Sequence, residues 1–156
     1  MKIRIVSVGK VRQSFIRDGE AEYLKRIKGN GLMVTLEELG LDSPQSLRPE
    51  EIKEREGEEI LKRIKAGELL VVLDERGKSP SSKEFAHRVD QWMQSGTKTA
   101  VFIIGGAYGF SEKVRHAADY VLSLSSMTLP HQLTRLMLVE QLYRVQTLLQ
   151  GTGYHK

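Results

Sequence analysis

Cysteine is absent from this sequence of 156 residues. Its absence excludes disulfide bonds, a thiolate nucleophile, and the zinc and iron–sulfur sites that are built on cysteine. The four histidines are scattered along the chain, without the spacing that metal ligands share. The sequence therefore predicts no resident metal ion.

Long apolar runs are also absent. None approaches the ~18 residues that a membrane-spanning helix needs. The basic start at Lys2 and Arg4 is not followed by the apolar segment of a secretory signal. We therefore expect a cytoplasmic protein that does not contact a membrane.

Neither sign of charge dominates the composition. Lysine and arginine number 24 and aspartate and glutamate 20, which gives a formal net charge of +4. This mild excess is compatible with a nucleic-acid partner but does not demand one. Hydrophobic residues make up 40% and charged residues 28%, as in ordinary folded proteins. Because no linker or repeat interrupts the chain, we expect residues 1–156 to form one domain.

Strand-like and helix-like patterns alternate along the chain. The expected strands cover residues 2–9, 32–39, 69–73, 99–104 and 120–124, and the expected helices cover residues 14–28, 49–66, 81–95, 111–117 and 131–149. Three of the strands are continuous apolar runs, which is typical of strands buried on both faces of a parallel sheet. The order predicts an α/β fold with a mainly parallel sheet and a ligand crevice at the carboxyl ends of the strands.

Two loops at those ends resemble nucleotide-binding motifs without matching them. Gly77-Lys78-Ser79 looks like the end of a P-loop, but Val72 stands where that motif needs a glycine. Ser81 or Ser82 then suits the N-cap of the next helix. The loop over residues 104–110 has the spacing G-G-x-x-G instead of G-x-G-x-x-G. It is either a tight turn only or a place where backbone approaches a ligand.

A third loop covers residues 123–131 and is rich in serine. It lacks the G-x-S-x-G pattern of a hydrolase nucleophile. His131 has two interpretations, as the start of a helix or as a catalytic group, and the residues alone leave both open.

The closing helix carries apolar residues on more than one face, from Leu133 to Leu149. Such a helix is either deeply buried or in contact with a second subunit, and we expect a homodimer. Arg135 and Arg144 lie about 180° apart around its axis, so they do not form one patch. By composition, the tail from Tyr154 to Lys156 is typical of a solvated end.

Taken together, several segments resemble one known family, the pseudouridine N3-methyltransferases of large-subunit ribosomal RNA (methyltransferase H type), which belong to the SPOUT class. The similar segments are Leu73 to Lys78, Ile104 to Gly109, Leu122 to His131, Glu140 to Arg144, and Tyr154-His155. The resemblance covers the whole chain, and the order and spacing of the segments make it specific.

The resemblance implies a SPOUT α/β knot, a single domain whose C-terminal part forms a trefoil knot. It also implies a homodimer that binds S-adenosylmethionine and methylates a pseudouridine in helix 69 of 23S ribosomal RNA, read within the assembled ribosome. The implied cofactor positions, contacted largely through backbone groups, are Leu73, Gly105, Leu124, Ser125, Ser126, Met127, Thr128 and Leu129.

For catalysis, we hypothesise that His131 and the tail residues Tyr154 and His155 line the pocket of the base. Tyr154 would stack on the base or hydrogen-bond to it, and a histidine would take the proton that leaves N3. Arg135 and Arg144 would stabilise the developing negative charge or hold a phosphate. The tail departs from the family in one residue, because Gly153 stands where the family usually has proline. Glycine leaves φ free, so the tail is less pre-organised.

Three other functions remain open at this stage. The first is an RNA-binding module without catalysis, and the second is a nucleotide-cofactor enzyme of ordinary doubly wound topology. The third is a SPOUT methyltransferase with a different RNA target. Binding of S-adenosylmethionine separates the first two from the proposed enzyme, and the identity of the labelled RNA separates the third.

Overall fold

A computed structural model of the protein describes residues 1–27, 31–41, 46–152 and 154. Within them the chain forms five strands and five helices. In chain order these are β1 (Lys2–Val8), α1 (Ser14–Arg26), β2 (Met33–Leu39), α2 (Pro49–Leu61), β3 (Leu69–Lys78), α3 (Ser82–Gln94), β4 (Thr99–Ile104), α4 (Glu112–Ala117), β5 (Tyr120–Leu122) and α5 (His131–Leu149). All expected strands and helices are confirmed, with two bounds that differ by several residues.

The first difference concerns α2. We expected this helix to continue to about Ala66, but it ends at Leu61. Its last turn tightens, because Arg63 and Ile64 donate backbone hydrogen bonds three residues back instead of four. Pro49 opens the helix as expected.

The second difference concerns β3, which continues past Leu73 to Lys78. Leu122 of β5 lies opposite both Leu73 and Lys78, so the register between the two strands is irregular. The backbone N–H of Ser123 donates to the Lys78 carbonyl at 2.8 Å. A Cβ atom on Gly77 would lie 2.6 Å from the Val121 carbonyl oxygen, so only glycine allows this close approach.

The five strands form one sheet in the order β2-β1-β4-β3-β5. Every neighbouring pair is parallel, so the prediction of a mainly parallel sheet is confirmed. Since the strands are parallel, the segment of β3 after Leu73 and the loops after β4 and β5 lie close together at one edge of the sheet. The fold thus places the three loops of interest at one end of the molecule.

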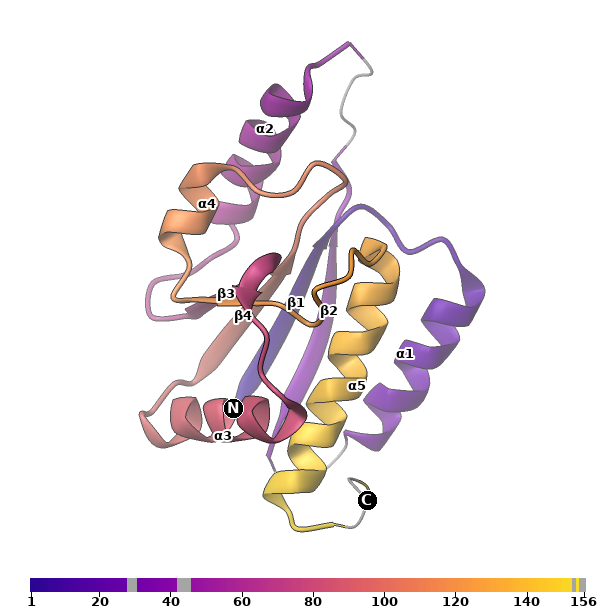
Figure 1. Ribbon diagram of the computed structural model, residues 1–156, viewed down its shortest axis with the longest axis vertical. Coiled ribbons are helices and arrows are strands. Elements are labelled where there is room, and N and C mark those ends of the chain that lie inside the picture. Colours follow the sequence, from indigo (N-terminus) through magenta and orange to yellow (C-terminus); the bar gives the residue numbers. More distant parts are fainter. Residues whose placement is uncertain (28–30, 42–45, 153, 155–156) are drawn as a thin grey trace.

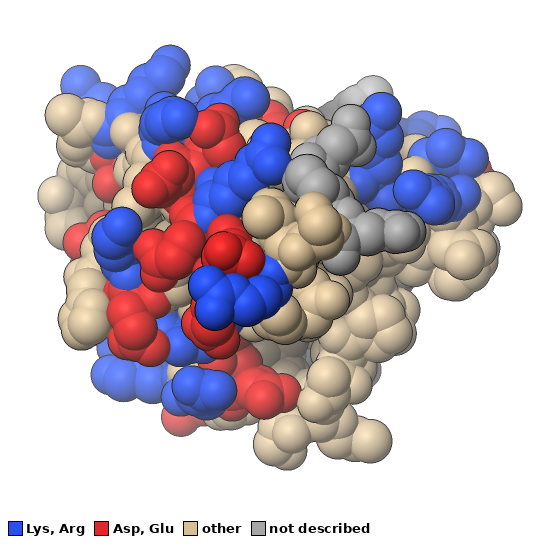
Figure 2. Space-filling view, turned by 90° about the horizontal axis from the view of Figure 1, so that it is seen from above, with Lys and Arg blue, Asp and Glu red and all other residues tan. Residues whose placement is uncertain are grey.

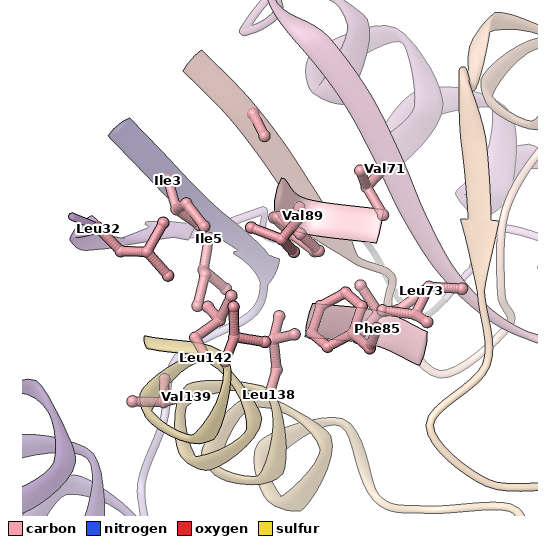
Figure 3. Close-up of a cluster of buried hydrophobic side chains, with 14 of the residues drawn as sticks. Ile3, Ile5, Leu32, Val71, Leu73, Phe85, Val89, Leu138, Val139 and Leu142 are labelled. Atoms are coloured by element: carbon pink, nitrogen blue, oxygen red, sulfur yellow. The ribbon is translucent and has the colours of Figure 1, made fainter. Parts of the chain in front are cut away.

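Helices cover both faces of this sheet, with α1, α3 and α5 on one face and α2 and α4 on the other (Figure 1). Alternate strand residues supply the two cores. On one face Ile3, Ile5, Val71 and Leu73 pack against α3 and α5 (Figure 3). Their neighbours in the strands turn to the other face and pack with Ile60 and other residues of α2 and α4. Burial on both faces explains the continuous apolar runs in the sequence.

Helix α5 lies between α1 and α3 and contributes four fully buried residues to the core. These are Leu138, Val139, Leu142 and Val145. Burial between two helices accounts for much of its apolar surface, which was the first of the two expected alternatives. Among the described residues, no helix is both long and apolar enough to cross a membrane.

Candidate active site

Two adjoining cavities lie at the carboxyl ends of β3, β4 and β5. The smaller has a volume of about 120 Å³ and the larger a volume of about 650 Å³. Leu73, Thr128 and Leu129 line both. The larger volume lies within the range of about 300–1,000 Å³ that is typical of small-molecule sites.

The residues predicted to bind the cofactor meet at these cavities. Those that line one or both are Leu73, Gly105, Leu124, Ser125, Met127, Thr128 and Leu129. Ser126 lies in the same loop and is exposed. Among the described residues no acidic and histidine side chains gather as a metal site would require. The geometry thus assembles the predicted positions, and their contact with a cofactor stays a prediction.

The loop between β5 and α5 is held by its own hydroxyl groups. The Ser123 hydroxyl donates to the carbonyl of Ser125 at 2.8 Å, and the Ser125 hydroxyl accepts from the backbone N–H of Met127 at 2.9 Å. Thr128 donates to Glu75 at 3.1 Å, which ties this loop to the second half of β3. The loop is therefore shaped without any charged residue of its own.

The charges at this end of the molecule are unevenly distributed. Figure 2 looks onto it from above, and acidic and basic side chains are interspersed over the side that α2 and α4 form, beside a region without charged side chains. Residues 122–130 contribute no charge. The side of the larger cavity formed by this loop is therefore uncharged, while Asp74, Glu75, Arg76 and Arg115 line the rest of it.

The glycine turn, residues 105–109 after β4, packs against the side chains of Phe110 and Glu56. A Cβ atom on Gly105 would lie 3.0 Å from the Phe110 ring, and one on Gly106 would lie 2.7 Å from a carboxylate oxygen of Glu56. Gly109 has a φ of +77°, which a side chain would strain. These glycines are therefore needed because a side chain would clash at Gly105 and Gly106 and would strain the backbone at Gly109.

Glu56 belongs to α2 and was missed in the sequence. Only 8% of the residue is exposed, and one of its carboxylate oxygens has no hydrogen-bond partner among the described residues. Burial raises the pKa of this carboxyl, and the backbone N–H of Gly106 opposes part of that rise. The available signal was its spacing, because Ile52, Glu56 and Ile60 recur every four residues on one face of α2.

His131 is the first residue of α5 and lines the larger cavity. A Cβ atom on Gly9, after β1, would lie 3.9 Å from its Nε2 atom. Both interpretations of His131 are therefore compatible with one position, because the residue starts the helix and faces the cavity.

Arg135 lies one turn further along α5 but is directed into the protein. Only 3% of it is exposed, and its guanidinium donates to both carboxylate oxygens of Glu20, at 2.5 and 2.8 Å. It also donates to Ser7 at 3.0 Å and to Glu38 at 3.1 Å. Burial lowers the pKa of Arg135, but Glu20 and Glu38 more than compensate and raise it overall. The expectation that Arg135 reaches the base or a phosphate finds no support in this geometry.

The other end of α5 carries a cluster of charged and aromatic side chains. Arg144 pairs with Glu140 at 2.5 Å, and its guanidinium carbon lies 4.9 Å from the centre of the Tyr154 ring. Tyr154 packs edge-on against Tyr143 at 4.6 Å and donates to Glu140 at 3.3 Å. Burial is the main cause that raises the pKa of Tyr154 to about 12. His155 and Gly153 lie outside the described residues.

The two groups of predicted catalytic residues lie far apart in one chain. His131 and Arg144 are thirteen residues apart on the same straight helix, which corresponds to about 20 Å along its axis. Tyr154 stays with Arg144. One chain therefore brings His131 to the cofactor cavities but leaves the tail cluster at the opposite end of α5.

Comparison with known proteins gives a consistent picture. A family described as predicted SPOUT methyltransferase matches residues 1–155. Proteins named "Ribosomal RNA large subunit methyltransferase H" are similar over the full length of both chains, with 41% identity in Streptococcus agalactiae and Carboxydothermus hydrogenoformans and 45% in Lactococcus lactis. The resemblance inferred from the motifs is confirmed. With the parallel sheet, the meeting of the three loops and this match over nearly every residue, the chain belongs to the SPOUT methyltransferase family.

Proposed function

We propose that this protein uses S-adenosylmethionine to methylate N3 of a pseudouridine in 23S ribosomal RNA, in helix 69 of the assembled ribosome. The observation that carries the proposal is the meeting of the uncharged loop 123–130 with the glycine turn over a cavity of about 650 Å³. Full-length relatives named as ribosomal RNA methyltransferases support RNA as the substrate. We expect the reaction to take place in the cytoplasm, where ribosomes work.

The site residues fit this cofactor. An adenosine and a methionine chain need apolar walls and backbone donors and acceptors, and the lining residues Leu73, Leu124 and Leu129 with the glycine turn offer both. Because Gly105 and Gly106 have no Cβ atom, the turn can pack closely against Phe110 and Glu56 while its backbone lines the cavity. When bound, the cofactor supplies an electrophilic methyl group on a positively charged sulfur.

The knot that is typical of the family also belongs to this proposal. We expect the chain after β5 to pass through the loop that follows β3. Support comes from the double register of Leu122 and from the close approach of Gly77 to Val121. A knot at this place would hold the cofactor loops together with few side-chain contacts.

The protein's own part in the reaction is alignment and removal of one proton. The N3 atom of the base must lose its proton to attack the methyl group, and the proton needs an acceptor within hydrogen-bond reach. His131 lines the cavity and is the proposed acceptor. Tyr154 would orient the base through its ring or hydroxyl, and Arg144 would offset the negative charge that develops on the base. His155 is proposed as a second residue of the base pocket.

A homodimer would complete the site. Since one chain holds His131 and the tail cluster about 20 Å apart, the tail of a second chain must supply Tyr154 and Arg144 if all three act on one base. A two-fold axis across two antiparallel α5 helices would create two such sites at once. Half-buried apolar residues on the outer side of α5, among them Leu133 and Met137, favour this contact.

The test uses purified protein and radiolabelled S-adenosylmethionine. Three acceptors are compared: assembled ribosomes that lack the modification, their separate large subunits, and naked 23S RNA. We expect label on the RNA of assembled ribosomes, mapped to N3 of a helix 69 pseudouridine. Cofactor binding without label on any acceptor would point to another RNA target. Failure to bind the cofactor would contradict the enzymatic proposal and leave an RNA-binding module.

A further inference from the structure

A second groove, of about 540 Å³, lies on the side of the sheet where β5 is the edge strand. The end of β3, helix α3 and the start of β5 form its walls. Its chemistry comes mainly from Lys78, Lys83, Arg88 and Tyr120. The cofactor site described above uses none of these four residues.

The groove carries an excess of positive charge. Within the described parts of the chain, Lys78, Lys83 and Arg88 form no ion pair with a carboxylate. One acidic residue, Glu84, lines the groove, and its carboxylate already accepts the backbone N–H of Ser81 at 2.7 Å. Three cations that are not neutralised within the chain favour an anionic ligand.

An aromatic ring lies among these cations. The Nζ atom of Lys78 is 5.9 Å and the guanidinium carbon of Arg88 is 5.6 Å from the centre of the Tyr120 ring. Trp92 packs edge-on against the same ring at 5.6 Å and fixes its position. Cations combined with an aromatic ring are the usual means by which proteins hold a nucleic-acid strand without reading its sequence.

The groove is continuous with the cofactor site through an intermediate hollow. This hollow has a volume of about 220 Å³. It shares Pro80 with the basic groove. It shares Leu122, Ser123 and Leu124 with the smaller cofactor cavity. A chain bound in the groove would thus need to pass only one small hollow to reach the cofactor end.

We propose that this basic groove binds the phosphodiester backbone of RNA next to the nucleotide that is methylated. The inference rests on the proposed function, because it takes the RNA substrate as the ligand. Lys78, Lys83 and Arg88 would each contact a phosphate, and Tyr120 would offer the edge or face of its ring to a sugar or base. The groove would hold RNA without sequence preference, and selection of the target nucleotide would remain with the cofactor site.

The experiment compares two variants of equal charge. The first replaces Lys78, Lys83 and Arg88 by glutamine. The control replaces Lys25, Lys65 and Lys98, three exposed lysines outside the groove, by glutamine. For each we measure the KM for ribosomes, the affinity for S-adenosylmethionine, and the affinity for oligouridylate over a range of salt concentrations.

We expect the groove variant to raise the KM for ribosomes about tenfold or more, with kcat and cofactor affinity unchanged. Its plot of log affinity for oligouridylate against log salt should become shallower by about 2 to 3, since each lost phosphate contact removes about 0.7 to 0.9. The control should resemble the natural protein. Equal cofactor affinity also shows that the variant is folded.

Two results would overturn the inference. If the natural protein methylates ribosomes and the groove variant matches the lysine control in KM and salt slope, the groove is not an RNA site, while the proposed function stands. If the variant changes the sedimentation of the protein instead of its RNA affinity, the groove belongs to a contact between copies. Loss of oligouridylate binding in a protein that never methylates ribosomes would instead support the groove and contradict the proposed function.

Discussion

The two ends of helix α5 differ in how they are built. At its start, His131 meets loops whose surface is mostly backbone, glycine and uncharged side chains. At its end, Arg144, Glu140, Tyr143 and Tyr154 form a cluster of charges and rings. The first end has the features of a cofactor pocket. The second has side chains that can grip a base or a phosphate, but no cavity of the pocket's kind adjoins it among those described.

Under the proposed function, this contrast means that neither end of one chain would be a complete site. A methyl donor needs a pocket of fixed shape, which close backbone packing provides. A nucleotide needs aromatic and charged side chains, which we propose that the tail cluster provides. The middle of α5 joins the two ends, and Arg135, one turn from the start of the helix, ties α5 to α1 through Glu20. Variants along α5 can therefore separate the roles of the two ends.

The largest expected effect comes from breaking the buried pair of Arg135 and Glu20. Replacing Arg135 by alanine should lower the free energy of unfolding by about 3–5 kcal/mol, because it leaves the Glu20 carboxylate buried without its partner. Both ends of the helix should then lose function together. Urea unfolding followed by circular dichroism measures the change.

Two controls sharpen this result. Arg26→Ala removes an exposed pair with Glu22 and should cost about 0.3–0.5 kcal/mol. The double variant Arg135→Met with Glu20→Leu should recover most of the lost stability, because no charge then stays buried alone. If Arg135→Ala costs no more than Arg26→Ala, the buried pair does not anchor α5.

The next effect tests whether the two ends cooperate across a dimer. His131→Ala and Tyr154→Ala should each reduce methyl transfer about a hundredfold, as expected for loss of a proton acceptor or an orienting group. Mixing the two inactive variants after joint refolding should restore about a quarter of the natural activity. Half of the dimers are then mixed, and each mixed dimer has one intact site.

The measurement is methyl transfer to ribosomes before and after mixing. A useful control is a mixture of His131→Ala with a chain that carries both substitutions, which should stay inactive. If the first mixture regains activity and the control mixture does not, Tyr154 acts in the same site as the partner's His131. Persistent inactivity of the first mixture would mean that both residues act within one chain.

Much of the fold could be predicted from the sequence, because buried parallel strands give continuous apolar runs such as Leu69 to Leu73. The cofactor positions could be predicted only through the resemblance, since backbone contacts leave little trace in residue type. The extension of β3 to Lys78 was missed because its charged residues are typical of a turn. The pair between Arg135 and Glu20 spans 115 residues, and no local pattern reveals such a partner.

A smaller effect is expected at the glycine turn. Gly106→Ala would place a Cβ atom 2.7 Å from the Glu56 carboxylate, so the turn or the carboxylate must shift. We expect the affinity for S-adenosylmethionine to fall about tenfold, which corresponds to about 1.4 kcal/mol. Isothermal titration calorimetry measures this affinity. At saturating cofactor, we expect the rate of methyl transfer to stay close to that of the natural protein.

Two further variants test the cause. Gly40→Ala is the matched control, because its Cβ atom would lie 3.6 Å from Lys10, an ordinary contact. Combining Gly106→Ala with Glu56→Asp shortens the opposing side chain and should restore affinity. If the double variant binds as weakly as Gly106→Ala alone, contact with Glu56 is not the reason, and the glycine is needed for approach of the ligand itself.

The smallest expected effect concerns pH and the tail. Because folding raises the pKa of Tyr154 to about 12, the folded protein favours the neutral phenol. The stability that this group contributes is complete below the ordinary tyrosine pKa of about 10 and is lost as the pH rises toward 12. At neutral pH the hydroxyl is therefore a hydrogen-bond donor and not a base.

Tyr154→Phe should lower kcat by the same factor at every pH between about 6 and 9, which leaves the shape of the pH profile unchanged. A basic limb that disappears in Tyr154→Phe would show that the phenol ionises during the reaction, and the proton would then leave through the tail end of α5 instead of through His131.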